Sequence, residues 1–531
     1  MNLNHARLPI PPREQRERHR SHKNRSRNIR IPISAEESQQ VLGCLKFDSV
    51  RRRSVHMFRY FQSLIDVAKI GSVALALTLP SVSLAAEPPN VVLFLIDDLG
   101  WKDLGCYDAD YYETPHIDAL AASGVRFTNG YAASAVCSPT RASVVTGKYP
   151  SRIGITDWIR ARFQGGKGGL DTPFDQGYGA AGKDGLLCPK NPFFLPKEHF
   201  TIAEALKSKG YKTCYIGKWH LGYDPYYPEH QGYDFNYGGC DYGQPPSYFD
   251  PYTNPKLKQG IYNLPGRKKG EYLTDREADE AISFIAEFGR EQPFFLQMST
   301  YTVHTPIQSK NDQTARFPRK KNAKYAGMVA SLDDAVGKVL QKLEEIDVSK
   351  RTIVIFTSDN GGLDSNGSPT ECAPLRQGKG HPYEGGIRVP LIIRWPGVTT
   401  PGATTETPAI SPDLFPTICS AADVDLPADH ITDGVDLRPL LAGGDLLERS
   451  LLWHFPHYRG GILPYSIIRD GKWKLLKRYA GDKEFELYDL ENDLSEARDL
   501  SASMPEKVEE LNKKLSQLLE ETGSRLPKLA K

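Results

Sequence analysis

The chain has 531 residues, of which 39% are hydrophobic, 25% charged and 10% aromatic. That length is enough for one large core and a smaller second domain. The composition excludes a fibrous protein, a largely disordered chain and a multi-span membrane protein, and the formal net charge of +2 gives no reason to expect a nucleic-acid partner.

The first 86 residues differ from the rest of the chain. Residues 1–56 hold 13 Lys and Arg against 5 Asp and Glu without apolar periodicity, which predicts a disordered basic leader that need not belong to the native protein. Met57 opens a segment typical of a signal peptide, with an apolar run at 70–79 followed by small residues. The run is too short to span a membrane, so we predict a signal peptide at 57–86 and an exported, periplasmic or secreted, protein without a stable membrane span. A nucleic-acid-binding arm and a buried helix are the alternative interpretations of these two segments.

Without this leader, residues 87–531 carry 52 basic and 59 acidic side chains, a formal charge of −7. An anionic substrate would therefore be held by a local cluster of cations and not by the net charge. Eight cysteines are present, and none forms a CxxC or a Cys/His zinc spacing. An exported chain can pair some of its cysteines, but the sequence does not say which.

Beyond residue 90, apolar runs of strand length alternate with helical patterns. This alternation predicts an α/β protein with a large, mostly parallel central sheet flanked by helices. The runs at 90–96 and 351–357 are expected to be strands that are buried on both faces. The elements expected between them are a helix from Thr201 to Gly210, a strand at 211–216, a helix at 274–288, a strand at 293–299 and a helix at 325–343.

Two further regions have their own character. The Gly-rich stretch 158–197 is predicted to be a long loop, either facing a substrate or forming a surface insert. Near residue 441 the pattern changes to alternating strands around Asp470-Gly471, followed by an amphipathic helix. We therefore predict a large α/β domain at 87–440 and a small C-terminal α+β domain with an antiparallel sheet at 441–531.

Both long buried strands are followed by acidic residues. Asp97 and Asp98 follow the first strand, and Asp359 and Asn360 follow the second. Ligands of α/β sheets bind beyond the carboxyl ends of the strands, and carboxylates that meet there without a partner would repel one another. A hard divalent cation with oxygen ligands, Ca²⁺ before Mg²⁺, resolves this conflict. Capping of a following helix is the alternative interpretation of the first pair.

A helix with a reactive group at its beginning is predicted by AVCSPTRASVVTG. Ser138 can cap this helix, Pro139 suits its first turn and Gly147 can end it. Cys137 and Arg141 are four residues apart and can lie on one side of the first turn, where free backbone N–H groups favour an anion. A buried free cysteine beside a surface arginine is the alternative interpretation.

Several basic side chains are candidates for the same site. Lys218 and His220 are two residues apart at the end of a strand and therefore lie on one face, and His304 lies beyond another strand. Lys379 stands among glycines that let the backbone approach a ligand. Taken singly, such residues are usually solvated lysines or structural histidines.

In combination, these stretches resemble the type I, formylglycine-dependent sulfatases of the alkaline-phosphatase-like superfamily. Residues 137–141 look like the formylglycine signature, and 210–222 like the second sulfatase signature. SDNGG and GKGHPYEGGIRVP resemble the later metal and lysine motifs in the same order. Thr140, where serine is commoner, is a mild departure. The similarity runs from about residue 90 to beyond 496, so the resemblance implies an alkaline-phosphatase-like sandwich over nearly all of the mature chain.

The resemblance also implies an arylsulfatase- or carbohydrate-sulfatase-like activity, the hydrolysis of sulfate monoesters, with one Ca²⁺ ion. A formylglycine-generating maturation enzyme would oxidise Cys137 to formylglycine, whose hydrated aldehyde would supply the nucleophilic oxygen. The implied metal ligands are Asp97, Asp98, Asp359, Asn360 and the hydrate at Cys137.

Roles for the basic residues follow from the same resemblance. Arg141 would steady the hydrate and the metal carboxylates. Lys218, His304 and Lys379 would bind the sulfate oxygens, and His304 or Lys379 would protonate the departing alcohol. His220 would help to release sulfate.

The substrate is expected to be a sulfated poly- or oligosaccharide, with small aryl sulfates as incidental substrates. Trp158, Arg160, Arg162 and the aromatic stretch 240–252 are candidates for contacting it. The nearest alternative is a formylglycine-dependent phosphonate or phosphate ester hydrolase, although two-metal phosphatases of this fold usually have histidine where Asn360 stands. An unmodified, non-catalytic sugar-binding homologue is the second alternative.

Overall fold

The computed structural model describes most of the chain beyond the expected signal peptide. The described residues are 87–161, 177–182, 184–257, 260–261, 263–264, 266, 268–318, 322–364 and 370–530. They belong to one compact unit. The basic leader at 1–56, the signal peptide at 57–86 and Arg162 lie outside them, so these predictions stay untested by the structure. Within the described residues, no helix is long and apolar enough to cross a membrane.

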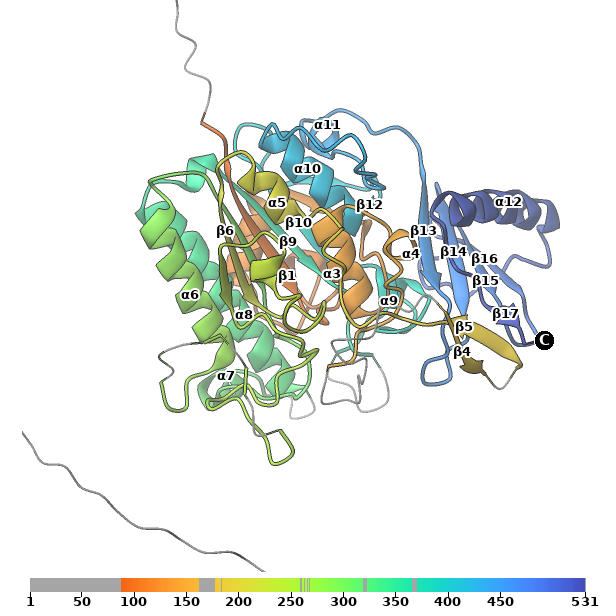
Figure 1. Ribbon diagram of the computed structural model, residues 1–531, viewed down its shortest axis with the longest axis horizontal. Coiled ribbons are helices and arrows are strands. Elements are labelled where there is room, and N and C mark those ends of the chain that lie inside the picture. Colours follow the sequence, from red (N-terminus) through yellow and green to blue (C-terminus); the bar gives the residue numbers. More distant parts are fainter. Residues whose placement is uncertain are drawn as a thin grey trace, which may run out of the picture. The chain divides into compact units, whose positions relative to one another are not determined.

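The largest sheet in the described part of the chain has eight strands in the order β11-β2-β10-β9-β1-β8-β6-β7 (Figure 1). Its strands are β1 (Asn90–Ile96), β2 (Val125–Phe127), β6 (Lys212–Gly217), β7 (Phe235–Tyr237), β8 (Phe294–Ser299), β9 (Thr352–Ser358), β10 (Leu391–Arg394) and β11 (Ala403–Thr405). Strand β10 is antiparallel to both of its neighbours, and the other pairs are parallel. The prediction of a mostly parallel central sheet is therefore confirmed.

Strands β1 and β9 are central and pair along their whole length. Every residue of both strands is buried, as expected for apolar runs that are covered on both faces. The pairing is in register from Asn90 opposite Thr352 to Ile96 opposite Ser358. Because the two strands are parallel and end at the same level, the residues that follow them emerge side by side.

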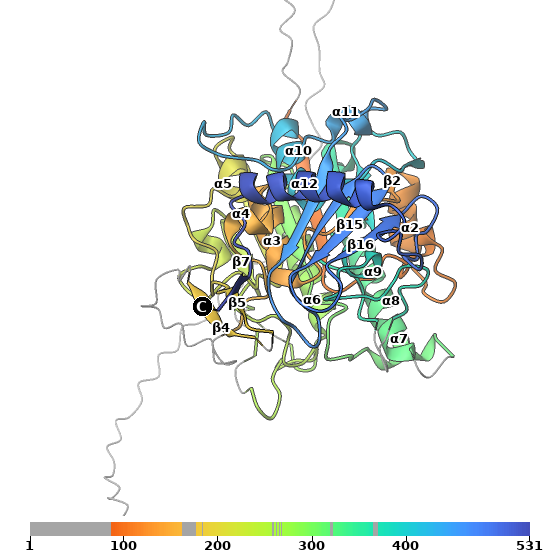
Figure 2. The ribbon, with the colours of Figure 1, turned by 90° about the vertical axis from the view of Figure 1, so that its right-hand side faces the viewer.

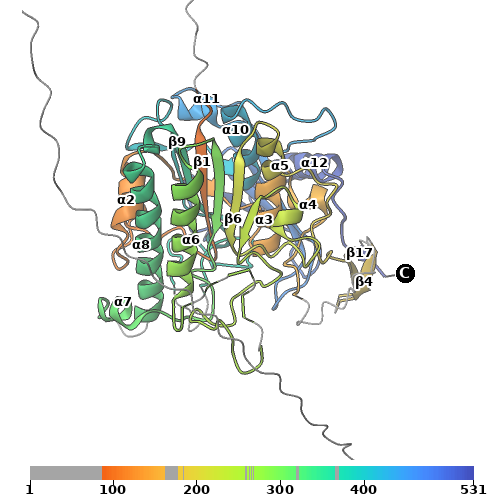
Figure 3. The same cartoon turned by 60° about the vertical axis from the view of Figure 1, so that its left-hand side comes forward.

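Helices cover both faces of this sheet, as Figure 3 shows for α6 and α8 on one side and α3 and α5 on the other. The side chains of β1 alternate between two buried clusters: Val92 and Phe94 pack with α6 and α8, whereas Val91 and Leu93 pack with α3, α5 and α10. This period of two is the geometry of a strand between two helical layers. The helices are α2 (Pro115–Ala122), α3 (Cys137–Thr146), α4 (Pro150–Ile153), α5 (Ile202–Lys207), α6 (Leu273–Phe288), α7 (Asn311–Ala315), α8 (Ala323–Glu345), α9 (Glu384–Ile387), α10 (Leu414–Ala421), α11 (Arg438–Leu441) and α12 (Pro505–Glu521), with short 3₁₀ turns at Gly105–Tyr107, Pro228–His230, Ser349–Arg351 and Ser411–Asp413.

The C-terminal region contains a four-stranded antiparallel sheet with α12 lying across it (Figure 2). Its strands are β13 (Ser450–Phe455), β14 (Tyr465–Asp470), β15 (Trp473–Arg478) and β16 (Phe485–Asp489). Helix α12 buries Leu511, Leu515 and Leu519, which are spaced four apart and therefore form one face. The predicted antiparallel sheet, its turn at Asp470-Gly471 and the amphipathic helix are confirmed.

The prediction of one long loop over 158–197 is wrong for its described second half. Strands β4 (Tyr178–Ala181) and β5 (Leu186–Pro189) form a hairpin, and β17 (Lys528–Leu529) pairs with β5. A further small sheet joins β3 (Gly130–Tyr131) to β12 (Ala409–Ile410). Strand β17, which pairs with β5, comes from the far end of the chain, so no local pattern could reveal the sheet of β4, β5 and β17.

Candidate active site

The acidic residues that follow β1 and β9 lie together beyond the ends of these strands. The Asp98 amide donates to Asp359 Oδ1 at 3.3 Å, and Asn360 Nδ2 donates to Asp98 Oδ1 at 2.8 Å. Asp97, Asp98, Asp359 and Asn360 are all buried. No helix begins directly after Asp98, since the next element is the 3₁₀ turn at Gly105–Tyr107, where Leu104 occupies the N-cap position. The two strand ends thus bring three carboxylates and an amide together, as predicted, and the capping alternative is wrong.

Helix α3 begins at Cys137, and Gly147, with a left-handed φ of 70°, is its C-cap residue. The prediction that Ser138 caps this helix is wrong, because Val136 occupies the N-cap position. The Ser138 hydroxyl instead donates to the His220 carbonyl and accepts from the Ile159 amide, both at 2.9 Å. These bonds tie the start of α3 to the two loops that carry His220 and Trp158.

The Cys137 side chain is buried between a carboxylate and a lysine. Its thiol lies 3.8 Å from Asp97 Oδ1, to which it donates, and its sulfur accepts from Lys379 Nζ at 3.3 Å. Burial raises the pKa of Cys137, although Lys218 and Lys379 oppose this effect. The thiol is therefore protonated at neutral pH and is itself a poor nucleophile.

Three cations face the three carboxylates. Arg141 Nε lies 2.7 Å from Asp359 Oδ2, Lys218 Nζ lies 2.7 Å from Asp97 Oδ2, and Lys379 Nζ lies 2.5 Å from Asp98 Oδ1. Arg141 also donates to the Lys218 carbonyl at 2.6 Å. Because Arg141 is only 1% exposed, the alternative of a surface arginine is wrong.

The two carboxylates after β1 have pKa values that are shifted in opposite directions. Burial, opposed by Lys218 and reinforced by Asp359, raises the pKa of Asp97 to about 7. Against the effect of burial, Lys379 and His304 lower the pKa of Asp98. The attraction of Lys218 therefore does not fully offset the cost of burying the negative charge of Asp97.

His220 and His304 lie at the same site as Cys137. His304 Nε2 lies 3.5 Å from Asp98 Oδ2, and its Nδ1 lies 2.9 Å from the Thr305 carbonyl. Burial lowers the pKa of His304 to about 3. His220 Nε2 lies 2.7 Å from the Ile159 carbonyl, and burial lowers its pKa as well. Both imidazoles are thus neutral at pH 7 in the structure described.

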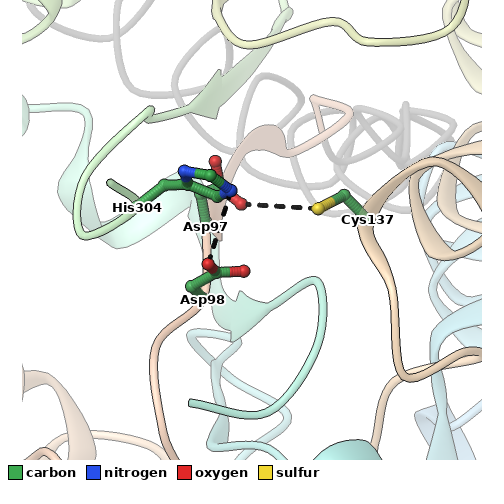
Figure 4. Close-up of side chains that lie close together, drawn as sticks. All are labelled: Asp97, Asp98, Cys137 and His304. Atoms are coloured by element: carbon green, nitrogen blue, oxygen red, sulfur yellow. Dashed lines mark hydrogen bonds and ion pairs between the residues drawn. The ribbon is translucent and has the colours of Figure 1, made fainter. Parts of the chain in front are cut away.

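The donor set fits a hard cation. Figure 4 shows the side chains of Asp97, Asp98, Cys137 and His304 close together, with ligand atoms that all lie within 4.8 Å of one another. Asp98 Oδ2 and Asn360 Oδ1 are buried and accept no hydrogen bond from any described residue. Such an acceptor costs about 1–3 kcal/mol when it is left unsatisfied, and a cation with oxygen ligands such as Ca²⁺ would satisfy both.

A cavity of about 330 Å³ opens onto Cys137, His220, His304 and Lys379. The other lining residues are Val136, Trp158, Gly243, Gln244, Thr305, Leu363, Asp364, His381 and Arg459. Of the candidates for substrate contact, Trp158 and part of the stretch 240–252 do line the cavity. Arg160 is exposed and lies with its guanidinium carbon 5.6 Å from the Trp158 ring centre.

Sequence reasoning missed His381 and Arg459 in this wall. His381 lies two residues after Lys379, inside the motif that was singled out for its glycines, and that proximity was a usable signal. Arg459 comes from the turn after β13, far along the chain, and only the turn itself is visible in the sequence. A Cβ on Gly378, beside Lys379, would come within 2.3 Å of the Gly362 carbonyl oxygen, so this glycine is required for backbone packing; an approach of the backbone to a ligand stays a prediction.

Comparison with known proteins places these residues in context. A sequence model of the sulfatase family matches residues 89–424, and a model described as the C-terminal part of N-sulphoglucosamine sulphohydrolase matches residues 378–524. Arylsulfatase A of Homo sapiens is 34% identical over 429 residues, covering 76% of this chain and 77% of its own length. N-acetylgalactosamine-6-sulfatase of Rattus norvegicus is 34% identical over 399 residues, covering 71% of this chain and 70% of its own.

The fold is also similar to a solved structure. The crystal structure of Ps i-CgsB in complex with k-i-k-neocarrahexaose has a TM-score of 0.69 and 28% sequence identity, and the match covers 81% of this chain and 93% of that one.

Proposed function

Since the chain belongs to the sulfatase family, whose members hydrolyse sulfate esters on an alkaline-phosphatase-like fold, we propose that it removes sulfate from sulfated poly- or oligosaccharides. The observation that carries the proposal is the position of Cys137, buried at the first residue of α3 between Asp97 and Lys379 and lining the cavity. A thiol in that place is protonated and unreactive. We therefore assign Cys137 as the precursor of a formylglycine that a formylglycine-generating maturation enzyme would form.

The proposed formylglycine, as its hydrate, would supply an oxygen nucleophile and a second hydroxyl through which sulfate can be expelled. The residues around it prepare this position. Lys379 Nζ already lies 3.3 Å from the Cys137 sulfur, so it can hold an oxygen there. Arg141 fixes Asp359 and the Lys218 carbonyl, which keeps the lysine close to Asp97.

We propose Asp97, Asp98, Asp359 and Asn360 as the residues that would hold Ca²⁺. Bound there, the ion would stabilise negative charge on the sulfate oxygens and on the nucleophile. Among the described residues of the site, three carboxylates are matched by three cations, so a divalent ion would give the site the net positive charge that a sulfate monoester requires. Asn360 donates to Asp98 in place of a second imidazole ligand, which favours one ion over a two-metal phosphatase site.

Proton transfer is assigned to the residues that line the cavity. His304 or Lys379 would protonate the departing alcohol. Lys379 carries the proton in the structure described, because, against burial, Asp98 raises its pKa, whereas burial leaves His304 neutral. The neutral His220 would take up the proton when sulfate is freed. Positioned acid–base groups of this kind typically contribute ~10²–10⁴-fold in rate. Lys218, His304 and Lys379 would bind the sulfate oxygens.

A carbohydrate substrate is supported by the relative named for N-acetylgalactosamine 6-sulfate and by the similar structure that holds a neocarrahexaose. Trp158 supplies an aromatic surface in the cavity on which a sugar ring can pack. Aryl sulfates would be incidental substrates. We further propose export through the segment 57–86, and the division of the mature chain into a catalytic domain at 87–440 and a C-terminal subdomain at 441–531.

Mass spectrometry of the exported, natively expressed protein tests this proposal. Trypsin releases Cys137 in the peptide 127–141, which is bounded by Arg126 and Arg141. We expect the aldehyde in place of the thiol, sulfate release from a panel of sulfated saccharides, and loss of both in Cys137→Ala. Full activity with an unmodified thiol would contradict the assignment of Cys137, and activity on aryl sulfates alone would contradict the carbohydrate substrate.

A further inference from the structure

Arg459 reaches the cavity from the turn that joins β13 to β14. The backbones of Arg459 and Ile462 hydrogen-bond to each other in both directions, at 3.0 and 2.7 Å. Gly460 and Gly461 between them have left-handed φ values of 52° and 90°, which glycine adopts without strain. A tight turn that is closed by two backbone hydrogen bonds restricts the position of the Arg459 side chain.

The guanidinium of Arg459 leaves one donor unpaired among the described residues. Its Nη1 is buried and makes no hydrogen bond, and the side chain forms no ion pair within that part of the chain. The group packs against the residue after Lys379, because a Cβ on Gly380 would lie 2.9 Å from Nη1. A buried donor that makes no hydrogen bond is costly, and the half-buried Arg459 side chain lines the cavity, so the position is one that a ligand would stabilise.

The nearby carboxylates form no ion pair with Arg459, although Arg459 opposes the rise that burial causes in the pKa of Asp157. Asp364 lines the same cavity, but its Oδ2 accepts from the Cys372 amide at 3.0 Å. Asp157 accepts from the Trp158 amide at 2.8 Å. Neither forms an ion pair with Arg459 in the described structure. His381 also lines this wall, and burial together with Arg459 lowers its pKa, so it adds a neutral ring and not a counter-charge.

We propose that Arg459 is a specificity-determining residue that binds a second anionic group of the substrate, a sulfate or carboxylate on the same sugar as the scissile sulfate or on its neighbour. The planar guanidinium presents paired donors that match the oxygens of such groups. The scissile sulfate is assigned to Lys218, His304 and Lys379, so Arg459 remains for another anion. A cavity of about 330 Å³ is at the small end for ligand pockets, which keeps the two anions close together. This inference rests on the proposed function.

Arg459→Gln tests the inference on four substrates. These are a disulfated disaccharide, a monosulfated disaccharide with a uronate, a neutral monosulfated disaccharide and 4-nitrophenyl sulfate. We expect kcat/KM for substrates with a second anion to fall roughly 10- to 100-fold relative to kcat/KM for the neutral one, mainly through KM. The substrate with the larger loss identifies the anion as sulfate or carboxylate. Arg459→Lys, which keeps the charge without the planar fork, should lose less.

Arg498→Gln is the matched control, because it removes the same charge from the C-terminal region at an exposed position. It should leave the substrate preference at the wild-type value. An equal loss by Arg459→Gln on all four substrates would indicate a structural role and overturn the inference. Unchanged kinetics on all four would overturn it as well.

A binding measurement separates this inference from the proposed function. If the wild-type protein releases no sulfate from any substrate, the proposed function fails. Calorimetric binding of the disulfated disaccharide to Cys137→Ala, with and without Arg459→Gln, then still tests Arg459. Weaker binding without the guanidinium supports the inference, and equal binding contradicts it.

Discussion

Asp359→Asn should destabilise the protein even when no metal is bound. Asp359 and Arg141 form a buried ion pair, 0% and 1% exposed, with Nε and Oδ2 2.7 Å apart. The amide keeps the shape of the side chain and can still accept from the Asp98 backbone, but it leaves the Arg141 charge without its main partner. Removal of one partner from a buried pair costs about 3–5 kcal/mol. Against burial, Asp359 and then Asp97 raise the pKa of Arg141, so Asp97 compensates in part and we expect a loss of about 3 kcal/mol.

Equilibrium urea unfolding in the presence of a chelator measures this loss, followed by tryptophan fluorescence. Glu113→Gln is the matched control, because it breaks the ion pair between Glu113 and Arg316, whose side chains are 56% and 39% exposed, respectively. Exposed ion pairs of this kind contribute about 0–1 kcal/mol to the free energy of unfolding. The double variant Asp359→Asn with Arg141→Met should lose less than the sum of the two single variants, since no buried charge is left alone. If Asp359→Asn loses no more than Glu113→Gln, the buried pair does not stabilise the site as argued.

Buried histidines, a glycine beside the cavity and the oxygen cluster give further expected outcomes. Burial lowers the pKa of His454 to about 4 and that of His457 to about 3, so below about pH 6.5 the unfolded chain binds more protons than the folded chain. The unfolding free energy should therefore fall on acidification by about 1.4 kcal/mol per pH unit for each histidine. Urea titrations between pH 7.5 and 5 should find a smaller slope for His454→Asn than for the wild type. Gly378→Ala, beside Lys379, places a Cβ 2.3 Å from the backbone carbonyl oxygen of Gly362, so thermal unfolding should show a larger loss than for Gly179→Ala, where the nearest atom lies 3.8 Å away. Chelation should abolish sulfate release, and restored Ca²⁺ at 100 times its Kd should raise the unfolding free energy by about 2.7 kcal/mol; an unfolding midpoint that is independent of Ca²⁺ would argue against the metal ligands.

The acidic cluster could be predicted because two simple rules determine it. Uninterrupted apolar runs indicate strands that are buried on both faces, and parallel strands place their carboxyl ends at one edge of the sheet. Asp97 and Asp359 therefore had to emerge at the same edge, and the register of β1 and β9 makes them neighbours. Neither rule depends on a contact that is invisible in the local sequence.

Other features depend on contacts that only the folded chain reveals. Ser138 is a good cap by type, yet its hydroxyl bonds to the His220 carbonyl and the Ile159 amide, and these tertiary bonds displace the local one. The hairpin of β4 and β5 is joined by β17 from the end of the chain. Arg459 enters the cavity for the same kind of reason, since its turn belongs to a sheet that packs beside α9.

The attachment of that sheet explains how a turn so distant in sequence can recognise a substrate with fixed geometry. Lys474 of β15 is buried between Glu384, the first residue of α9, and Glu496, at 2.9 and 2.7 Å. Helix α9 follows Lys379 by only a few residues, so the C-terminal sheet and the lysine proposed to bind sulfate are fastened to one short segment. A buried pair resists displacement because parting it leaves an uncompensated charge. The distance between Lys379, proposed to bind sulfate, and Arg459 is therefore restricted, and the proposed discrimination of two anions on one sugar requires such a restriction.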